Sequence, residues 1–167
     1  EGVAAVTAVL LLLPQIPMLF MGQEWGTKQP FQFFCDLGPD LEDAVREGRR
    51  KEFAAFPEFA DPKAREQIPD PTAESTYQAS MLNWSELNEP GHQRMLNLHR
   101  ELLEIRSAEI VSRLAGAPGG SAATEWNRNA AFLVSWRLGD ASVLRLLANL
   151  SPEPAEGAPP RPNGSLI

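Results

Sequence analysis

The stretch from residue 3 to residue 21 limits the fold most, because it contains no charged side chain. Its length approaches the ~20 apolar residues that a transmembrane helix needs. Pro14 and Pro17 interrupt it, however, and proline ends a helix because it has no amide hydrogen to donate. No Lys or Arg precedes the run, so it lacks the pattern of a signal peptide. We therefore expect no membrane span, but a helix over residues 2–12 and a short buried strand over residues 16–21.

The overall composition excludes several classes of protein. The chain has 15 basic and 22 acidic side chains and a net charge of −7, whereas nucleic-acid binding rests on clustered positive charge. Hydrophobic residues make up 43% of the chain, which is typical of a globular protein. The single cysteine, Cys35, permits no intrachain disulfide and favours a cytoplasmic protein. We find no cofactor motif, and two histidines without a neighbouring cysteine predict no metal site.

A polar loop follows the predicted strand, in the order helix, turn, buried strand and loop that is typical of an α/β protein. In closed parallel barrels the loops after the strands carry the function. Glu24 and Trp25 lie in this loop between two glycines. An indole offers a flat face to a sugar ring and a carboxylate accepts bonds from its hydroxyls, so the pair fits a carbohydrate site. A structural turn with a buried tryptophan explains the same residues equally well.

Helical patterns dominate the middle of the chain. Residues 40–53 predict a helix capped by Asp40, on which Arg46, Arg49 and Arg50 share one face. Guanidinium groups could clamp a polar ligand there, although surface ion pairs with neighbouring glutamates explain the same charges. Residues 54–72 contain four prolines and predict a long irregular loop, which is often functional. We expect a short helix within residues 72–82 and a longer amphipathic helix from Pro90 to about Ser107.

The pattern changes to that of strands in the last third of the chain. Apolar residues alternate over residues 132–138, and residues 143–150 form a second, mostly apolar run. Gly139 and Asp140 between them predict a two-residue hairpin turn. We therefore expect two domains, residues 1–107 and residues 108–167, of which the second is a β-rich module that looks truncated after Leu150. The absence of an initiator methionine indicates a piece of a longer protein.

Three segments resemble a known family. Residues 14–26, PQIPMLFMGQEWG, resemble the segment around the last barrel strand of the α-amylase superfamily of glycoside hydrolases. Residues 45–56, VREGRRKEFAAF, closely resemble an insertion in the malto-oligosyltrehalose trehalohydrolases. Residues 80–87, SMLNWSEL, agree, although Asn83 stands where the family usually has aspartate, and Leu37 replaces a usual histidine.

The resemblance implies a fold and an activity. The fold class is α/β plus β: the C-terminal end of a (β/α)8 barrel (last strand, long loop and last helix) followed by an incomplete antiparallel β-sandwich domain. The implied parent enzyme is a retaining glycoside hydrolase that uses two carboxylates to release trehalose from malto-oligosyl trehalose, or acts on a related α-glucan, by cleaving the adjacent α-1,4 bond. In the family the catalytic acids come from earlier strands, and none matches this chain. We therefore assign no catalytic residue and expect the isolated chain to be inactive.

Five residues are our candidates for substrate binding: Glu24, Trp25, Arg49, Arg50 and Trp84. Two alternative functions stay open, namely a fragment of a glycogen branching enzyme and a non-catalytic carbohydrate-binding or scaffold module. The arginine-rich insertion argues against the branching enzyme. If the apolar stretch at residues 3–21 is exposed in the isolated chain, we also expect the chain to associate with itself.

Overall fold

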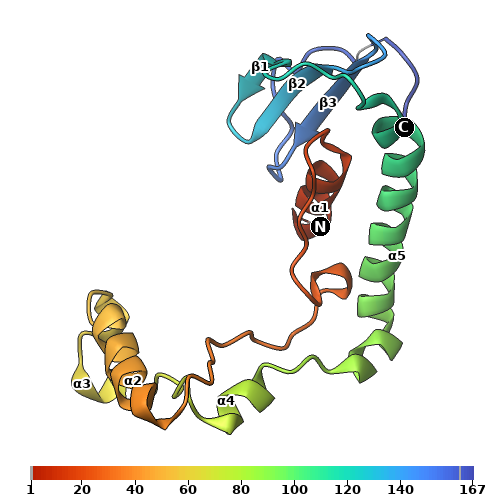
Figure 1. Cartoon of the computed structure of the whole chain (residues 1–167). Helices are drawn as coiled ribbons and strands as arrows, with labels where there is room; N and C mark the ends of the chain where they lie inside the picture. Colours follow the sequence, from red (N-terminus) through yellow and green to blue (C-terminus); the bar gives the residue numbers. More distant parts are fainter. Residues whose placement is uncertain (1, 162) are drawn as a thin grey trace. The chain divides into compact units, whose positions relative to one another are not determined.

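The computed structural model describes residues 2–161 and 163–167 and contains two compact units. The first unit combines the chain up to Gly26 with Leu87–Ile167, and the second comprises Thr27–Glu86. Figure 1 shows the elements of both in sequence colours. The predicted division into residues 1–107 and 108–167 was based on the change from helical to strand patterns along the chain, and it stays a prediction.

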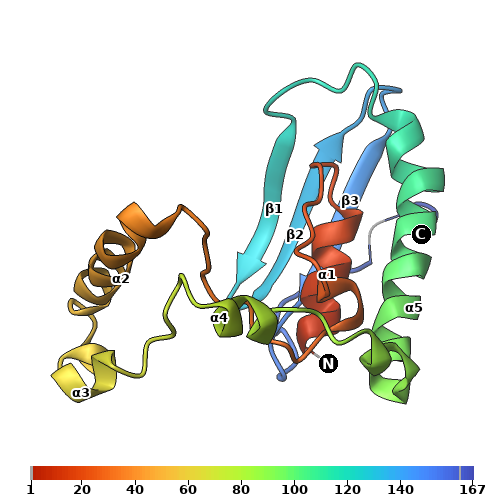
Figure 2. The same ribbon diagram turned by 60° about the horizontal axis from the view of Figure 1, so that its bottom comes forward.

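Two helices form the helical part of the first unit. Helix α1 spans Gly2–Leu12 and α5 spans Pro90–Ile105, which confirms both predicted helices. The last helix continues as a wider π turn, η4 (Arg106–Ile110), and a 3-10 turn, η5 (Val111–Arg113). Helices α1 and α5 pack side by side, as both Figure 1 and Figure 2 show. Within the described residues, no helix is long and apolar enough to cross a membrane.

The segment after α1 differs from its prediction. Residues 16–20 form neither helix nor strand, and Ile16 and Met18 are 93% and 87% exposed. A strand exists only where a neighbouring strand accepts and donates its backbone hydrogen bonds. The described part of the chain places no strand beside this segment, so the predicted buried strand over residues 16–21 is not formed here.

A three-stranded antiparallel sheet completes the first unit. Its strands are β1 (Ala122–Arg128), β2 (Ala131–Arg137) and β3 (Val143–Asn149), in the order β1-β2-β3. The hairpin between β2 and β3 is confirmed, but its loop is longer than predicted. Leu138 donates its amide to the carbonyl of Ser142 at 2.9 Å, which leaves a three-residue loop. Its third residue, Ala141, takes a left-handed φ of 68°, the usual geometry of such loops.

The interior of the first unit draws on the helices and the sheet. Leu11 of α1 and Ile110 of η4 are fully buried, and His99 of α5 is nearly so. The sheet contributes Leu133 and Trp136 of β2 to the buried set. Polar residues dominate β1, and almost all of them are exposed, so this strand has little apolar alternation. That is why the sequence analysis did not predict it.

The second unit consists of short helices joined by turns. Its longest helix is α2 (Pro39–Phe53), which confirms the predicted helix. The cap differs: Asp40 lies inside the first turn, and Gly38, with a φ of 83°, precedes Pro39 at the helix start. The predicted loop at residues 54–72 contains two short helical segments. The remaining elements are η2 (Pro57–Phe59), α3 (Pro62–Arg65), α4 (Glu74–Ala79), which confirms the predicted short helix, and η3 (Trp84–Asn88).

Candidate functional site

The loop that carries Glu24 and Trp25 is a short 3-10 turn, η1 (Gln23–Trp25), fixed against α5. Gly22 and Gly26 flank it with left-handed φ values of 83° and 66°, which side chains with a Cβ rarely adopt. The carbonyl of Trp25 lies 2.8 Å from Nδ1 of His92, a buried residue in the first turn of α5. This contact joins residues that lie 67 positions apart in the sequence.

The two candidate residues of this turn differ in exposure. The Trp25 side chain is 2% exposed, so its ring packs in the interior of the unit, as the structural alternative expected. Glu24 is half-buried, at the surface of the same turn. The ring therefore helps to hold the turn in place, whereas the Glu24 side chain lies at the surface of the turn. Whether either residue contacts substrate stays a prediction.

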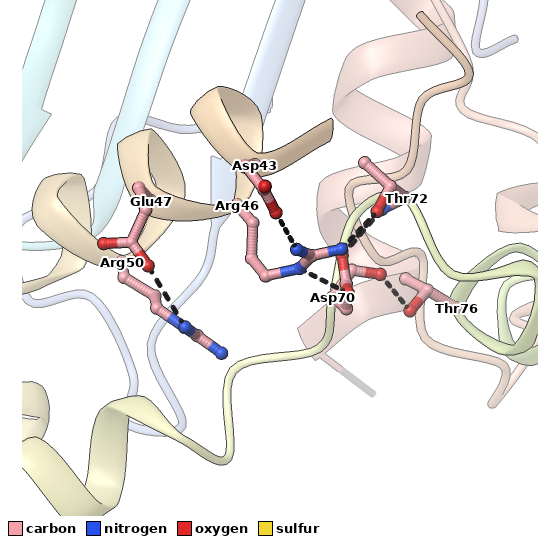
Figure 3. A network of polar contacts seen from close by, with 7 residues as sticks. All are labelled: Asp43, Arg46, Glu47, Arg50, Asp70, Thr72 and Thr76. Atoms are coloured by element: carbon pink, nitrogen blue, oxygen red, sulfur yellow. Dashed lines mark hydrogen bonds and ion pairs between the residues drawn. The ribbon is translucent and has the colours of Figure 1, made fainter. Parts of the chain in front are cut away.

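In the second unit, Arg46 of α2 is the centre of a polar network (Figure 3). Its Nε donates to Oδ2 of Asp70 at 2.7 Å, and its Nη1 donates to Oδ1 of Asp43 at 2.6 Å. Its Nη2 donates to the hydroxyl of Thr72 at 3.2 Å. A planar guanidinium can bond several oxygens in this way from three separate nitrogens, whereas a lysine has all its donors on one nitrogen.

The electrostatics of this network favour the ionised forms of Asp70 and Arg46. The amide of Thr72 donates to the Asp70 carboxylate, and this bond is the largest cause that lowers the pKa of Asp70 below its usual value. Bonds from Arg46 and from the Thr72 hydroxyl lower the pKa of Asp70 further, against the opposing effect of partial burial. The hydrogen bond with Asp70 in turn raises the pKa of Arg46.

The other candidates of this unit have different surroundings. The guanidinium carbon of Arg49 lies 4.4 Å from the ring centre of Phe53 and 4.9 Å from that of Phe33, which are cation–π distances. Its Nη1 also donates to Glu52 at 2.9 Å. Arg50 contacts Glu47 at 3.3 Å, and its side chain is 39% exposed. These ion pairs are the surface pairing with neighbouring glutamates that the sequence predicts as the alternative to a ligand clamp.

Trp84 begins η3 and is 63% exposed, so a large part of its indole is open at the surface of the second unit. The structure thus places Arg49 and Arg50 together on α2, Trp84 on η3, and Glu24 and Trp25 on η1 of the first unit. Among the residues described, no group of three His, Cys, Asp or Glu side chains could hold a metal ion.

Sequence reasoning did not foresee the partners of Arg46. Asp70 lies 24 positions away in the proline-rich loop, outside the reach of any helical spacing rule. The only local signal was the sequence around Asp70, with a threonine two residues later, which is typical of a turn closed by an aspartate side chain.

Comparison with solved structures defines the class of protein. A crystal structure assigned as an alpha amylase from Salmonella typhimurium matches 90% of this chain and 24% of its own, with a TM-score of 0.77 and 41% sequence identity. This likeness confirms the predicted fold class, the end of an α-amylase-type barrel followed by a sheet domain. A family model described as "Domain of unknown function (DUF3459)" matches residues 119–167, which contain the whole sheet.

Curated relatives narrow the class to one kind of enzyme. A protein of Deinococcus radiodurans named "Malto-oligosyltrehalose trehalohydrolase" is 48% identical over 104 residues, which are 62% of this chain and 17% of that protein. A protein of the same name from a Rhizobium species is 39% identical over 146 residues, 86% of this chain and 23% of that protein. The chain is therefore a relative of the malto-oligosyltrehalose trehalohydrolases, which confirms the resemblance seen in the sequence. It spans about one fifth of the length of these relatives.

Proposed function

We propose that this chain is part of a retaining glycoside hydrolase that releases trehalose from malto-oligosyl trehalose by cleaving the adjacent α-1,4-glucosidic bond. One observation carries the proposal: relatives of that name match up to 86% of the chain at 39% identity, and a solved alpha amylase structure shares its fold. In this proposal residues 1–107 belong to the catalytic barrel and residues 108–167 to the C-terminal sandwich domain. The single cysteine favours a cytoplasmic protein.

Within such an enzyme the chain contributes to substrate binding rather than to bond cleavage. Retaining hydrolysis needs a nucleophile and an acid–base carboxylate about 5 Å apart, and the resemblance assigns neither to this chain. Its candidate contacts are Glu24, Arg49, Arg50 and Trp84, and the buried Trp25 holds the turn that carries Glu24. The exposed indole of Trp84 suits the apolar face of a glucose ring, and the exposed guanidinium of Arg50 suits its hydroxyls.

The proposal predicts the behaviour of the isolated chain as well. The 167-residue chain alone should release no trehalose, because proximity of paired carboxylates supplies most of the rate. The exposed apolar side chains at residues 16–21 should also drive self-association, since contiguous exposed apolar surface is rare on monomers. Light scattering of the purified chain tests that expectation.

The decisive experiment assays the complete enzyme that contains this chain. Purified enzyme is incubated with malto-oligosyl trehalose and, separately, with a linear malto-oligosaccharide, and the products are separated by chromatography. We expect trehalose from the first substrate and no new α-1,6 branches from either. Branch formation without trehalose would replace the proposal by a branching enzyme, and the absence of both products would leave a carbohydrate-binding module.

A variant at Trp84 tests the binding role. Trp84→Ala in the complete enzyme should raise KM about tenfold with little change in kcat, because a lost stacking contact of roughly 1.4 kcal/mol is a tenfold change in affinity. Trp84→Phe keeps an aromatic face and should recover most of the loss. An unchanged KM in Trp84→Ala would remove this residue from the substrate site.

A further inference from the structure

The longest helix of the second unit has no buried side chain. Helix α2 carries Arg49 and Arg50, yet none of its residues is buried. Most helices in proteins are held by the burial of an apolar face, and this one is not. The orientation of α2 therefore rests on polar contacts, on the ring contacts of Arg49, and on the ring contacts of Phe53 with Phe56 and Phe59 at the end of the helix.

Residues 70–80, which α2 contacts through Arg46, are by contrast the best-packed part of the second unit. Pro71 is fully buried, and Thr76 and Ser80 are buried as well. The carbonyl of Pro71 accepts the amide of Cys35 at 2.8 Å. The hydroxyl of Thr76 donates to the carbonyl of Asp70 at 2.6 Å. This bond holds the backbone of Asp70 independently of the contacts of its side chain.

Arg46 connects the unburied helix to this packed segment. Its guanidinium reaches Asp70 and Thr72 across the turn while it also binds Asp43 on its own helix (Figure 3). Both Nη atoms and Nε already donate to protein oxygens, so the group is engaged within the unit. Arg50 lies one helical turn further along α2, paired only loosely with Glu47 at 3.3 Å.

We propose that Arg46 is a positioning residue. By its hydrogen bonds to Asp70 and Thr72 it sets the orientation of α2, and thereby presents Arg49 and Arg50 to an α-glucan chain. The inference rests on the proposed function, because it takes the α-glucan as ligand. Arg46 itself does not contact the sugar. A small shift of a substrate-positioning element is costly, since misplacement by about 1 Å can lower affinity or rate by an order of magnitude or more.

The test compares four variants of the complete enzyme. Arg46→Gln removes the guanidinium from the contact between Arg46 and Asp70, and Asp70→Asn removes the carboxylate. The variant with both changes completes a double-mutant cycle. The matched control is Lys51→Gln, which removes one positive charge from an exposed position of the same helix. Two quantities are measured in each: the Kd for maltoheptaose by calorimetry, and the hydrogen exchange of peptides from α2 and α4.

We expect Arg46→Gln to raise the Kd about tenfold, a change of about 1.4 kcal/mol in binding, while kcat stays within about twofold. Peptides of α2 should exchange faster and those of α4 should not. Asp70→Asn should have a similar effect on the Kd, and the double variant should be no worse than the worse single one, because both changes break the same contact. Lys51→Gln should resemble the wild type.

Three results would overturn the inference. They are an unchanged Kd in Arg46→Gln, an equal rise of the Kd in Lys51→Gln, or a change in binding free energy in the double variant that equals the sum of the two single changes. A general loss of stability is distinguished from a positioning role because it would lower kcat and speed exchange in α4 as well as α2. Failure of the proposed function has another signature, namely a wild-type enzyme that binds maltoheptaose but releases no trehalose. The Kd values then still decide the role of Arg46.

Discussion

The guanidinium of Arg106 is predicted to hold the first unit together at the end of α1. Pro14 and Pro17 lack the amide hydrogens that would continue the backbone bonding of this helix. Arg106 takes over that role across the unit. It donates to the carbonyl of Leu11 at 3.0 Å and to that of Gln15 at 2.7 Å, and it also bonds the carbonyl of Leu13.

The burial of the three carbonyls that Arg106 bonds sets the free energy of unfolding that a substitution of Arg106 should remove. Arg106 is buried, and burial lowers its pKa, but a guanidinium stays charged throughout the neutral range. Arg106→Met keeps most of the side-chain volume and removes all the donors. Leaving the buried carbonyl of Leu11 without its charged partner costs about 2 kcal/mol, and the two part-buried carbonyls add roughly 0.5 kcal/mol each because water can reach them. The expected loss of unfolding free energy is about 3 kcal/mol.

Urea unfolding of the chain, followed by tryptophan fluorescence, measures this loss, because three of the four tryptophans, Trp25, Trp126 and Trp136, lie in the unit that contains Arg106. With a typical slope for a small protein, a loss of about 3 kcal/mol moves the midpoint down by roughly 1.5 M urea. The control is Arg100→Met on the same helix, whose side chain is exposed and should matter by less than about 0.5 kcal/mol. If the two variants unfold at the same urea concentration, the capping argument is refuted.

Two further predictions concern the hairpin loop and the Arg46 network. Gly139→Ala should destabilise the first unit by about 2 kcal/mol, because the added methyl would overlap the backbone of Ala115, whereas Gly119→Ala, in open space, should be nearly neutral; urea unfolding distinguishes them. Asp70 has a pKa below its unfolded value, so its stabilising effect is complete above that value and is lost as the pH falls through the folded pKa. Carbon-13 NMR titration of the Asp70 carboxyl should show this low midpoint, and Arg46→Gln should raise it only partly, because the Thr72 amide is the larger cause. An ordinary aspartate midpoint in the wild type would contradict the network.

Local patterns in the sequence were sufficient for much of the fold. The apolar spacing after Pro90 predicted α5, and the arginine-rich run predicted α2. The alternation before Gly139 and the apolar run after it predicted the hairpin. Each of these signals is periodic and short-range, and backbone geometry turns such signals directly into a helix or a strand. The family resemblance came from the same local segments and was confirmed by the relatives.

The candidate site was less predictable from the sequence. The spacing of arginines on α2 named Arg49 and Arg50 but gave no sign that the helix lacks buried side chains. The indole of Trp25 fitted both a ligand surface and an interior position, and its packing at 2% exposure favours the interior. Composition alone could not separate these cases, because an aromatic ring serves equally well in a core and in a sugar site.

The positions of the helices and hairpin strands, and the enzyme family that the chain resembles, follow from residues close together along the chain, so local patterns were enough to predict them. The contacts that join these elements are visible only in the folded chain. Arg106 bonds carbonyls at and just beyond the end of α1, more than 90 positions away, His92 contacts Trp25 across 67 positions, and Arg46 bonds Asp70 across 24. The folded chain also leaves the side chains of Ile16, Met18 and Phe20 exposed. A strand and a buried face both require neighbours, and neighbours are a property of the folded chain rather than of any one segment.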